Sequence, residues 1–238
     1  MDTDILNEKF GEVRFLLDMG DFEKAEDILN EVHTNISKIN DNDLFIQYYL
    51  IKTDLYRCTR RRELNLVLWN EMERYCITDI HKCMRLSYLA NDYLRLKRYD
   101  EAFNFADAAL NVASGLDARN GLLSLQIKGE CFKVKKDWSN AIKMYSTIAS
   151  IAETDGNKAF VAKYHAKSAL MLYEMGYKQL AIDRLFEAEE HANELNNIDL
   201  IQKIAIWRAD LYRDMGDDKK ALDLLKVIAG FNNEYFYY

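Results

Sequence analysis

Apolar side chains recur along this chain with the spacing of an amphipathic helix. Four stretches place them at i, i+4 and i+7: Ala102-Ala106-Ala109, Ala141-Tyr145-Ile148, Ala181-Leu185-Ala188 and Ala221-Leu225-Ile228. Twelve positions before each stretch stands a small residue, followed three positions later by a larger one: Ala90 and Tyr93, Gly129 and Phe132, Ala169 and Leu172, Ala209 and Tyr212. Residues three apart share a helical face, so the small residue allows a second helix to approach and the larger one fills the gap. The pattern predicts pairs of packed helices.

The turns inside these pairs repeat in sequence. Residues 18–25 are DMGDFEKA, 214–221 are DMGDDKKA and 174–181 are EMGYKQLA, while 96–102 and 135–141 are more distant copies. A sixth copy, 58–64, is placed by spacing alone. We call the last residue of each copy the anchor. The anchors are Ala25, Leu64, Ala102, Ala141, Ala181 and Ala221, at intervals of 39, 38, 39, 40 and 40 residues. A fixed period of this length predicts a repeat array.

The sequence therefore predicts an all-α solenoid of about six helix-turn-helix repeats, with twelve helices of roughly 15 to 18 residues. The chain has no proline and only nine glycines, which favours long helices. The predicted repeats are approximately 3–39, 41–77, 78–115, 117–154, 156–195 and 197–230, within one domain over 1–230. Residues 231–238 form an aromatic tail, predicted to cap the last helix pair or to dock on a neighbouring molecule.

The small residue, the following aromatic residue, the Gly-x-aromatic-x-x-Ala turn and the alanine-spaced helix resemble the tetratricopeptide repeat family over about residues 6–230. The resemblance implies a right-handed superhelical solenoid. The family period is about 34 residues, and longer helices and Asn/Asp-rich joints at 40–43 and 196–199 account for the longer period here. Repeats near 40 residues are similar to those of bacterial peptide-pheromone receptors, the Rap and PlcR group.

Composition narrows the classes of partner and the compartment. The formal charge is -7, from 32 basic and 39 acidic residues, which is the wrong sign for a nucleic-acid-binding chain. No apolar run approaches the roughly 20 residues of a membrane helix, and the acidic start lacks the features of a secretion signal. The cysteines, Cys58, Cys76, Cys83 and Cys131, have no paired spacing. We expect reduced thiols and a cytoplasmic location, with no nucleic-acid or membrane partner.

Catalytic, metal and cofactor sites are not predicted. The tightest metal-like cluster, Cys76, His81 and Cys83, lacks a fourth ligand, so buried thiols and a surface histidine are the preferred interpretation. The histidines at 33, 165 and 191 are scattered over different repeats without a nearby nucleophile. Glycines mark turns or packing contacts and do not form a phosphate loop. We expect a protein that is not an enzyme.

The resemblance implies that the first helix of each repeat lines a concave face that binds another polypeptide. In the family this face is set by positions eleven, eight and seven before the anchor, extended by one turn. The predicted peptide- or partner-binding residues are Arg14, Tyr49, Thr53, Tyr56, Arg57, Ser87, Asn91, Arg95, Gln126, Glu130, Lys133, Tyr173, Glu174, Asp210, Arg213 and Asp214. The alternative is that these residues only make the inner face soluble. The basic run of Arg57 and 60–62 is either a grip for an acidic peptide or phosphate, or a solvated turn.

The preferred functional hypothesis is a non-catalytic adaptor that binds a peptide or protein. The alternatives are a regulatory domain that senses a peptide pheromone, and a scaffold or assembly subunit; a homodimer is possible. Seven positions before the anchors, charge passes from basic at Arg57 and Arg95 to acidic at Glu174 and Asp214. We therefore expect a bound segment to have a preferred direction. Reversing Arg57 and Arg95 to glutamate is expected to weaken binding and to leave the melting temperature nearly unchanged.

Overall fold

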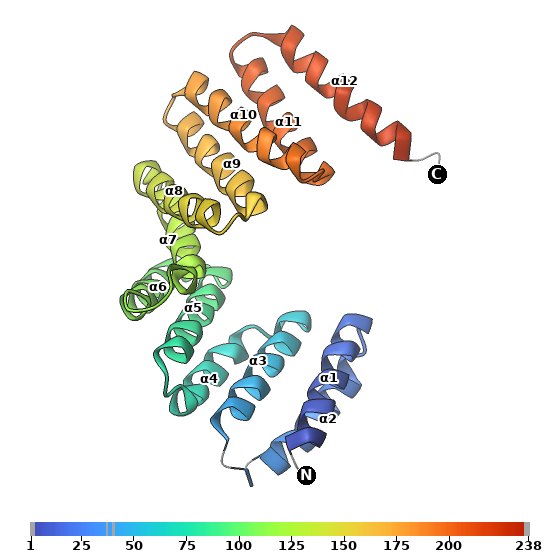
Figure 1. Cartoon of the computed structure of the whole chain (residues 1–238), viewed down its shortest axis with the longest axis vertical. Helices are drawn as coiled ribbons and strands as arrows, with labels where there is room; N and C mark the ends of the chain where they lie inside the picture. The colour runs from blue at the N-terminus through green and yellow to red at the C-terminus, as the bar shows by residue number, and fades with distance from the viewer. Residues whose placement is uncertain (1–2, 37, 40, 236–238) are drawn as a thin grey trace. The chain divides into compact units, whose positions relative to one another are not determined.

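The computed structural model describes residues 3–36, 38–39 and 41–235, with side chains described as far as Lys226. In this part of the chain the fold is entirely helical, with no strand, so the predicted all-α solenoid of about six helix pairs is confirmed (Figure 1). The α-helices are α1 (Thr3–Met19), α2 (Phe22–Ile36), α3 (Asn42–Cys58), α4 (Glu63–Met72), α5 (Asp79–Arg95), α6 (Tyr99–Ala113), α7 (Leu122–Val134), α8 (Trp138–Thr154), α9 (Lys158–Glu174), α10 (Lys178–Glu194), α11 (Ile198–Asp214) and α12 (Asp218–Tyr235). Two 3₁₀ turns, η1 (Glu73–Tyr75) and η2 (Ala118–Gly121), follow α4 and precede α7.

Short polar side chains start several helices. The side chains of Asp41, Thr78, Asp137, Asn157 and Asn197 accept hydrogen bonds from backbone amides at the starts of α3, α5, α8, α9 and α11. These bonds satisfy amide groups that have no partner inside the helix. The Asn/Asp-rich joints of the sequence are therefore helix caps where the structure describes them.

A residue with positive φ ends the first helix of every repeat, and it fixes the register of the repeats. These residues are Gly20, Arg60, Lys97, Lys136, Gly176 and Gly216. In five repeats the buried alanine anchor follows five residues later. The left-handed backbone conformation reverses the chain at the same point of each repeat, so the anchor is fixed by the turn geometry.

The second repeat corrects the sequence assignment by one residue. Five positions after Arg60 stands Asn65, whose side chain is 0% exposed, whereas the predicted anchor Leu64 is 43% exposed. The repeat spacing assigned the anchor to the apolar Leu64. The buried position is instead occupied by Asn65, whose side chain is hydrogen-bonded. The anchor of the second repeat is Asn65, and every position counted from Leu64 moves by one.

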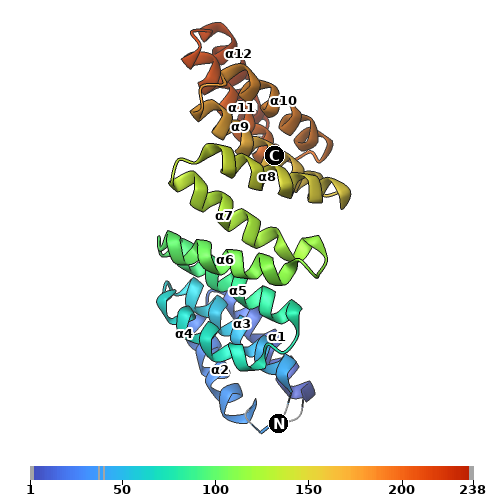
Figure 2. The same cartoon turned by 90° about the vertical axis from the view of Figure 1, so that its left-hand side faces the viewer.

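Contacts within the chain define two compact units, residues 1–127 and 128–238. Within each unit, consecutive helices lie side by side (Figures 1 and 2), as in the pairs α1–α2, α5–α6, α9–α10 and α11–α12. The core of the first unit contains large side chains, among them Phe10, Tyr48 and Trp69. A cluster in the second unit is rich in alanine, including Ala166 and Ala181, together with Leu185 and Leu211. Small side chains allow close helix approach there.

The last helix extends beyond the predicted end of the sixth repeat. Helix α12 continues to Tyr235, so residues 231–235 are helical. Residues 236–238, and the side chains of the whole predicted aromatic tail 231–238, lie outside the described residues. Capping or docking by this tail stays a prediction.

Candidate functional site

The structure sorts the sequence-predicted binding residues by exposure. The exposed ones are Arg14, Arg95, Glu174, Asp210, Arg213 and Asp214. The half-buried ones are Tyr56, Arg57, Asn91, Gln126, Glu130, Lys133 and Tyr173, and the buried ones are Tyr49, Thr53 and Ser87. The last three are buried by packing within the protein, although Tyr49 also lines a hollow described below, and binding at the predicted positions stays a prediction.

The register shift accounts for the burial of predicted positions in the second repeat. Counted from Asn65, Thr53 is the small residue twelve positions before the anchor and Tyr56 is the larger residue nine positions before it. Thr53 is fully buried and donates to the carbonyl of Leu50 over 2.7 Å. Successive helical positions are about 100° apart, so a shift of one residue turns binding positions into packing positions. Tyr56 stands at the position of the larger packing residue and is half-buried.

Tyr49 and Ser87 are buried by neighbouring helices. The hydroxyl of Tyr49 lies 3.5 Å from a carboxylate oxygen of Glu71 on α4. The hydroxyl of Ser87 on α5 is 2.8 Å from that of Ser124 on α7. Both hydroxyls contact side chains of neighbouring helices, and Tyr49 also lines the hollow beside α4.

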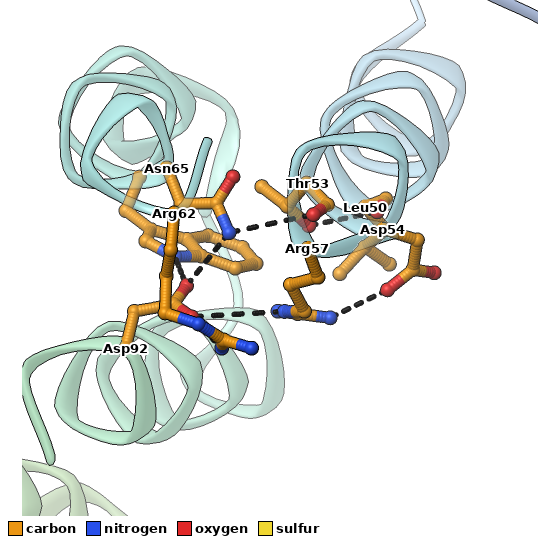
Figure 3. Close-up of polar contacts among 8 residues, drawn as sticks. Leu50, Thr53, Asp54, Arg57, Arg62, Asn65 and Asp92 are labelled. Carbon is orange, nitrogen blue, oxygen red and sulfur yellow. Dashed lines mark hydrogen bonds and ion pairs between the residues drawn. The ribbon is translucent and has the colours of Figure 1, made fainter. Parts of the chain in front are cut away.

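Three arginines of the basic run are used inside the protein, whereas Arg60 is exposed. Arg61 forms a bidentate pair with Glu26 over 3.0 and 2.8 Å, which joins the second repeat to the first. Arg62 donates to the carboxylate of Asp92 over 2.7 Å, and Arg57 lies 3.7 Å from the same carboxylate while also pairing with Asp54 (Figure 3). These three arginines therefore hold helices together, which neither of the two sequence interpretations anticipated.

Asp92 is the centre of a buried polar cluster. Its side chain is 0% exposed and accepts hydrogen bonds from Asn65 Nδ2 over 3.1 Å and Trp69 Nε1 over 2.7 Å, besides the bond from Arg62. The Arg57 guanidinium also lies over the ring of Trp69 at 5.8 Å. A buried carboxylate is tolerated when such partners surround it. The asparagine at the second anchor is explained by this cluster.

These pairings weaken the predicted charge gradient. At the basic end, Arg57 is neutralised by Asp54 and Asp92. At the acidic end, Asp214 accepts from Lys178 over 2.7 Å and from the Tyr173 hydroxyl over 2.9 Å. Asp210 pairs with Arg213 over 2.7 Å. Among these positions, Arg95 and Glu174 are exposed and form no ion pair with any described residue. Of the four charges in the predicted gradient, those of Arg95 and Glu174 are therefore the ones not neutralised by a described residue.

A pocket of about 490 Å³ lies between α9 and α11, the first helices of the fifth and sixth repeats. Its apolar lining includes Phe160, Ala166, Leu200 and Trp207. Three ammonium groups and one carboxylate join them: Lys163, Lys167, Lys203 and Asp199. The size is within the range of pockets that hold small ligands or a few side chains.

The lysines of this pocket differ in their partners. Lys167 pairs with Glu130 of α7. Neither Lys163 nor Lys203 forms an ion pair with a described residue. The Lys163 ammonium lies 5.5 Å from the centroid of the Phe160 ring and 5.4 Å from that of Tyr164. Burial, together with the positive charge of Lys167, lowers the pKa of Lys163. Two ammonium groups are thus available to an anionic ligand.

No protein-family model and no curated protein matches this chain, but solved structures do. BtubC from P. vanneervenii superposes with a TM-score of 0.75 at 15% identity, covering 98% of this chain and 93% of its own. A STAND signal-transduction ATPase with a tetratricopeptide repeat sensor, from Pyrococcus horikoshii, also gives 0.75 at 18% identity, covering 98% of this chain and 36% of its own. The chain has the tetratricopeptide-repeat fold. NprR in complex with its cognate peptide NprX gives 0.62 at 16% identity, covering 98% of this chain and 69% of its own.

The pocket residues lie one to two turns earlier along the first helix than the predicted binding positions. Lys163 and Lys203 stand eighteen positions before their anchors, and Lys167 and Trp207 stand fourteen before them. With the positions eleven and seven before the anchor, they form an i, i+4, i+7, i+11 face. None of the four was among the predicted binding residues, although the same helical face, extended by two turns toward the start of each helix, contains them.

A second and larger hollow, of about 790 Å³, lies beside the second helices α2 and α4 of the first two tetratricopeptide repeats. Its charged lining is balanced, with Lys52 and Arg74 against Glu71 and Glu73. Lys52 also donates to the Tyr48 hydroxyl over 2.8 Å. The hollow has aromatic rings in its lining, Tyr49 and Tyr56, but no surplus of charge, so the α9–α11 pocket, which combines aromatic rings with ammonium groups that have no described ion-pair partner, is the stronger candidate site.

The described residues contain neither a metal-binding cluster nor a membrane-spanning helix. Within them, no three His, Cys, Asp or Glu side chains lie close enough together to hold a metal ion. The Cys83 thiol is 3.5 Å from the carbonyl oxygen of Ala109 and 3.4 Å from that of Asn120. No helix in this part of the chain is long and apolar enough to cross a membrane.

Glu130 links the pocket to the helix packing beneath it. Its carboxylate accepts from the Tyr145 hydroxyl over 3.0 Å and from Lys133 over 2.6 Å, and it pairs with Lys167. Burial by itself would raise the pKa of Glu130, but the hydrogen bonds from Lys133 and Lys167 lower it from 4.5 to about 2. The carboxylate is therefore charged at any ordinary pH and keeps Lys167 at the pocket.

This pKa predicts a pH dependence of stability. The folded pKa lies below the unfolded value, so the stabilisation is fully present above pH 4.5 and is lost as the pH falls toward about 2. Glu130→Gln is expected to destabilise the protein by about 2 kcal/mol at pH 7 and to have little further effect at pH 2. Urea unfolding at both pH values measures this. The control Glu174→Gln changes an exposed carboxylate without an ion pair to any described residue, and a loss at pH 7 as large as that of Glu130→Gln would contradict the assignment.

Proposed function

We propose that this chain is a non-catalytic module that binds a polypeptide segment on the first-helix face of its repeats. The observation that carries the proposal is the pocket between α9 and α11, where aromatic side chains adjoin ammonium groups without internal ion-pair partners. Stacked helix pairs offer an extended face for a chain-like ligand, and tryptophan in a desolvated pocket is a frequent source of binding energy. Trp207 is the main contact residue.

A short peptide is favoured over a folded partner. A volume of about 490 Å³ suits a few side chains of a segment and not a broad flat interface. NprR, which shares this fold, was solved with its cognate peptide. These two observations support the narrower candidate, a regulatory domain that senses a short peptide. No described feature favours a scaffold subunit or a homodimer.

A display library of random 12-residue peptides, selected against the full chain, tests the proposal. The enriched peptides are expected to lose at least about tenfold in affinity for Trp207→Ala, because truncating a buried aromatic contact costs about 2 kcal/mol or more. Leu180→Ala on the second helix α10 is the matched control, because it removes an exposed apolar side chain outside the pocket. We expect its affinity to stay within about twofold of the parent.

A second variant distinguishes a local loss of binding from a loss of folding stability. Trp207→Phe keeps an aromatic ring in the pocket, so its melting temperature is expected to stay near that of the parent, and any binding defect is then local. Failure to enrich any peptide, or enrichment of peptides that bind Trp207→Ala as tightly as the parent, would exclude this face as the binding site.

A further inference from the structure

The charge of the α9–α11 pocket differs from the charge of the chain that forms it. The lining has three lysines, Lys163, Lys167 and Lys203, against one carboxylate, Asp199, in a chain of formal charge -7. Glu130 neutralises Lys167, which leaves Lys163 and Lys203 facing Asp199. The pocket thus remains positive by about one charge in a protein that is otherwise acidic.

The two available lysines occupy equivalent places in consecutive repeats. Both stand eighteen positions before their anchors, so the repeat geometry puts them at the same level of α9 and α11, which are in contact. The other four repeats have Asn7, Gln47, Met84 and Leu123 at this position. The lysine pair is therefore a local feature of the fifth and sixth repeats and not a general property of the array.

The surroundings of Lys163 hold its ammonium group at the pocket. The rings of Phe160 and Tyr164 lie within 5.5 Å of the nitrogen, and aromatic faces attract a cation. Like-charge repulsion from Lys167 acts on the same group, so an incoming anion relieves an unfavourable interaction. Beside these charges, Phe160, Leu200 and Trp207 present apolar surface, with the small Ala166 leaving space between them.

We propose that the α9–α11 pocket binds an acidic peptide segment, in which side-chain carboxylates flank an aromatic or other large apolar residue. The inference rests on the proposed function and names its ligand class. The apolar residue lies against Trp207 and Leu200, and the carboxylates pair with Lys163 and Lys203. A charged pair that is partly desolvated contributes direction and selectivity in addition to affinity.

Single-stranded nucleic acid also combines aromatic rings with negative charge, but it fits this face less well. Glu174 and Asp210 are exposed further along the same helices, and both repel a continuous phosphate backbone. A segment whose carboxylates are confined to the pocket avoids them. The acidic peptide is therefore the ligand that the charge distribution favours.

The 12-residue display library gives the first test. Peptides enriched on the full chain are expected to carry aspartate or glutamate next to an aromatic residue at least twice as often as the starting library. Replacing these acids by asparagine and glutamine in a synthetic, carboxy-amidated peptide is expected to weaken binding at least tenfold. The change from 50 to 500 mM NaCl is expected to weaken the acidic peptide and to leave the neutral one nearly unchanged.

Charge-matched variants of the protein assign the effect to the lysine pair. On Lys163→Gln/Lys203→Gln, the acidic and neutral peptides are expected to differ by less than twofold, because the partner charges are absent. The control Lys143→Gln/Lys219→Gln removes two exposed lysines from the second helices α8 and α12 and gives the same net charge. On this control the difference is expected to stay at tenfold or more.

The outcomes that overturn the inference differ from those that overturn the proposed function. Peptides that bind through Trp207 but tolerate loss of their acids would refute the acidic ligand and leave the binding face intact. A neutral peptide with a free carboxyl terminus that binds as tightly as the acidic amide would show that a chain end is bound, which also refutes an internal acidic segment. Tighter binding of a 12-nucleotide oligothymidylate would refute the peptide class. If every enriched peptide binds Trp207→Ala as tightly as it binds the parent, both proposals fail.

Discussion

Asp92→Ala is expected to lower the free energy of unfolding by about 3 to 5 kcal/mol, the range for breaking a buried ion pair by removing one partner. Asp92 is fully buried and accepts hydrogen bonds from Arg62, Asn65 and Trp69. Without the carboxylate, these donors and the nearby Arg57 guanidinium lose their acceptor while the surrounding packing prevents water from replacing it. Urea unfolding followed by circular dichroism measures the loss.

A neighbouring aspartate gives the control. Asp54 also pairs with Arg57, but its side chain is 55% exposed, and exposed pairs contribute between about 0 and 1 kcal/mol. Asp54→Ala is therefore expected to change stability by less than about 1 kcal/mol. Equal effects of the two substitutions would show that the buried cluster is not what stabilises this repeat. By the same reasoning, Arg57→Glu places a carboxylate against Asp92, so the sequence-based expectation of an unchanged melting temperature is withdrawn.

Gly129→Ala is expected to destabilise the protein by about 1 to 3 kcal/mol, the usual range for overpacking a core. Glycine inside a helix is ordinarily worse than alanine by about 1 kcal/mol, so this substitution would normally stabilise. Here a Cβ atom on residue 129 would lie 2.5 Å from Cε1 of Tyr145. The Tyr145 ring is fully buried and its hydroxyl is bound to Glu130, so it has little freedom to move.

Gly11→Ala tests the same chemical change without the contact. Gly11 lies inside α1, is exposed, and a Cβ atom there would meet nothing within 4 Å. This variant is expected to be more stable by up to about 1 kcal/mol. Opposite signs at the two glycines would establish the close approach at Gly129, and stabilisation at both sites would contradict it. Thermal unfolding of the two variants and the parent decides the question.

The Gly129 contact also reaches the proposed binding pocket. Tyr145 donates to Glu130, and Glu130 holds Lys167, which lines the pocket between α9 and α11. A displaced Tyr145 ring would therefore shift the charge arrangement at the pocket as well as the packing beneath it. Binding of an enriched acidic peptide to Gly129→Ala, measured well below its melting temperature, would report this connection.

Much of this architecture follows from local sequence. The period of 38 to 40 residues, the alanine anchors and the small residues twelve positions earlier were enough to predict helix pairs, because a helix face and a turn are defined by neighbours a few residues away. Ala102, Ala141 and Ala181 are each fully buried at the predicted anchor positions. The chain has no proline, which would interrupt a helix, so long helices were the expected structure.

Only the tertiary structure decided the second anchor and the candidate site. Asn65 replaces an apolar anchor because Asp92, 27 residues away, supplies its hydrogen-bond partner, and no local pattern contains that partner. The sequence predicted a free basic charge at Arg57 for the same reason, since burial and pairing depend on helices that meet only in the folded chain. The pocket combines Lys163 of α9 with Trp207 of α11, which only the folded chain brings into one lining. Sequence therefore determined which residues share a helix face, whereas the packing of one face against the next determined which of them remain available to a ligand.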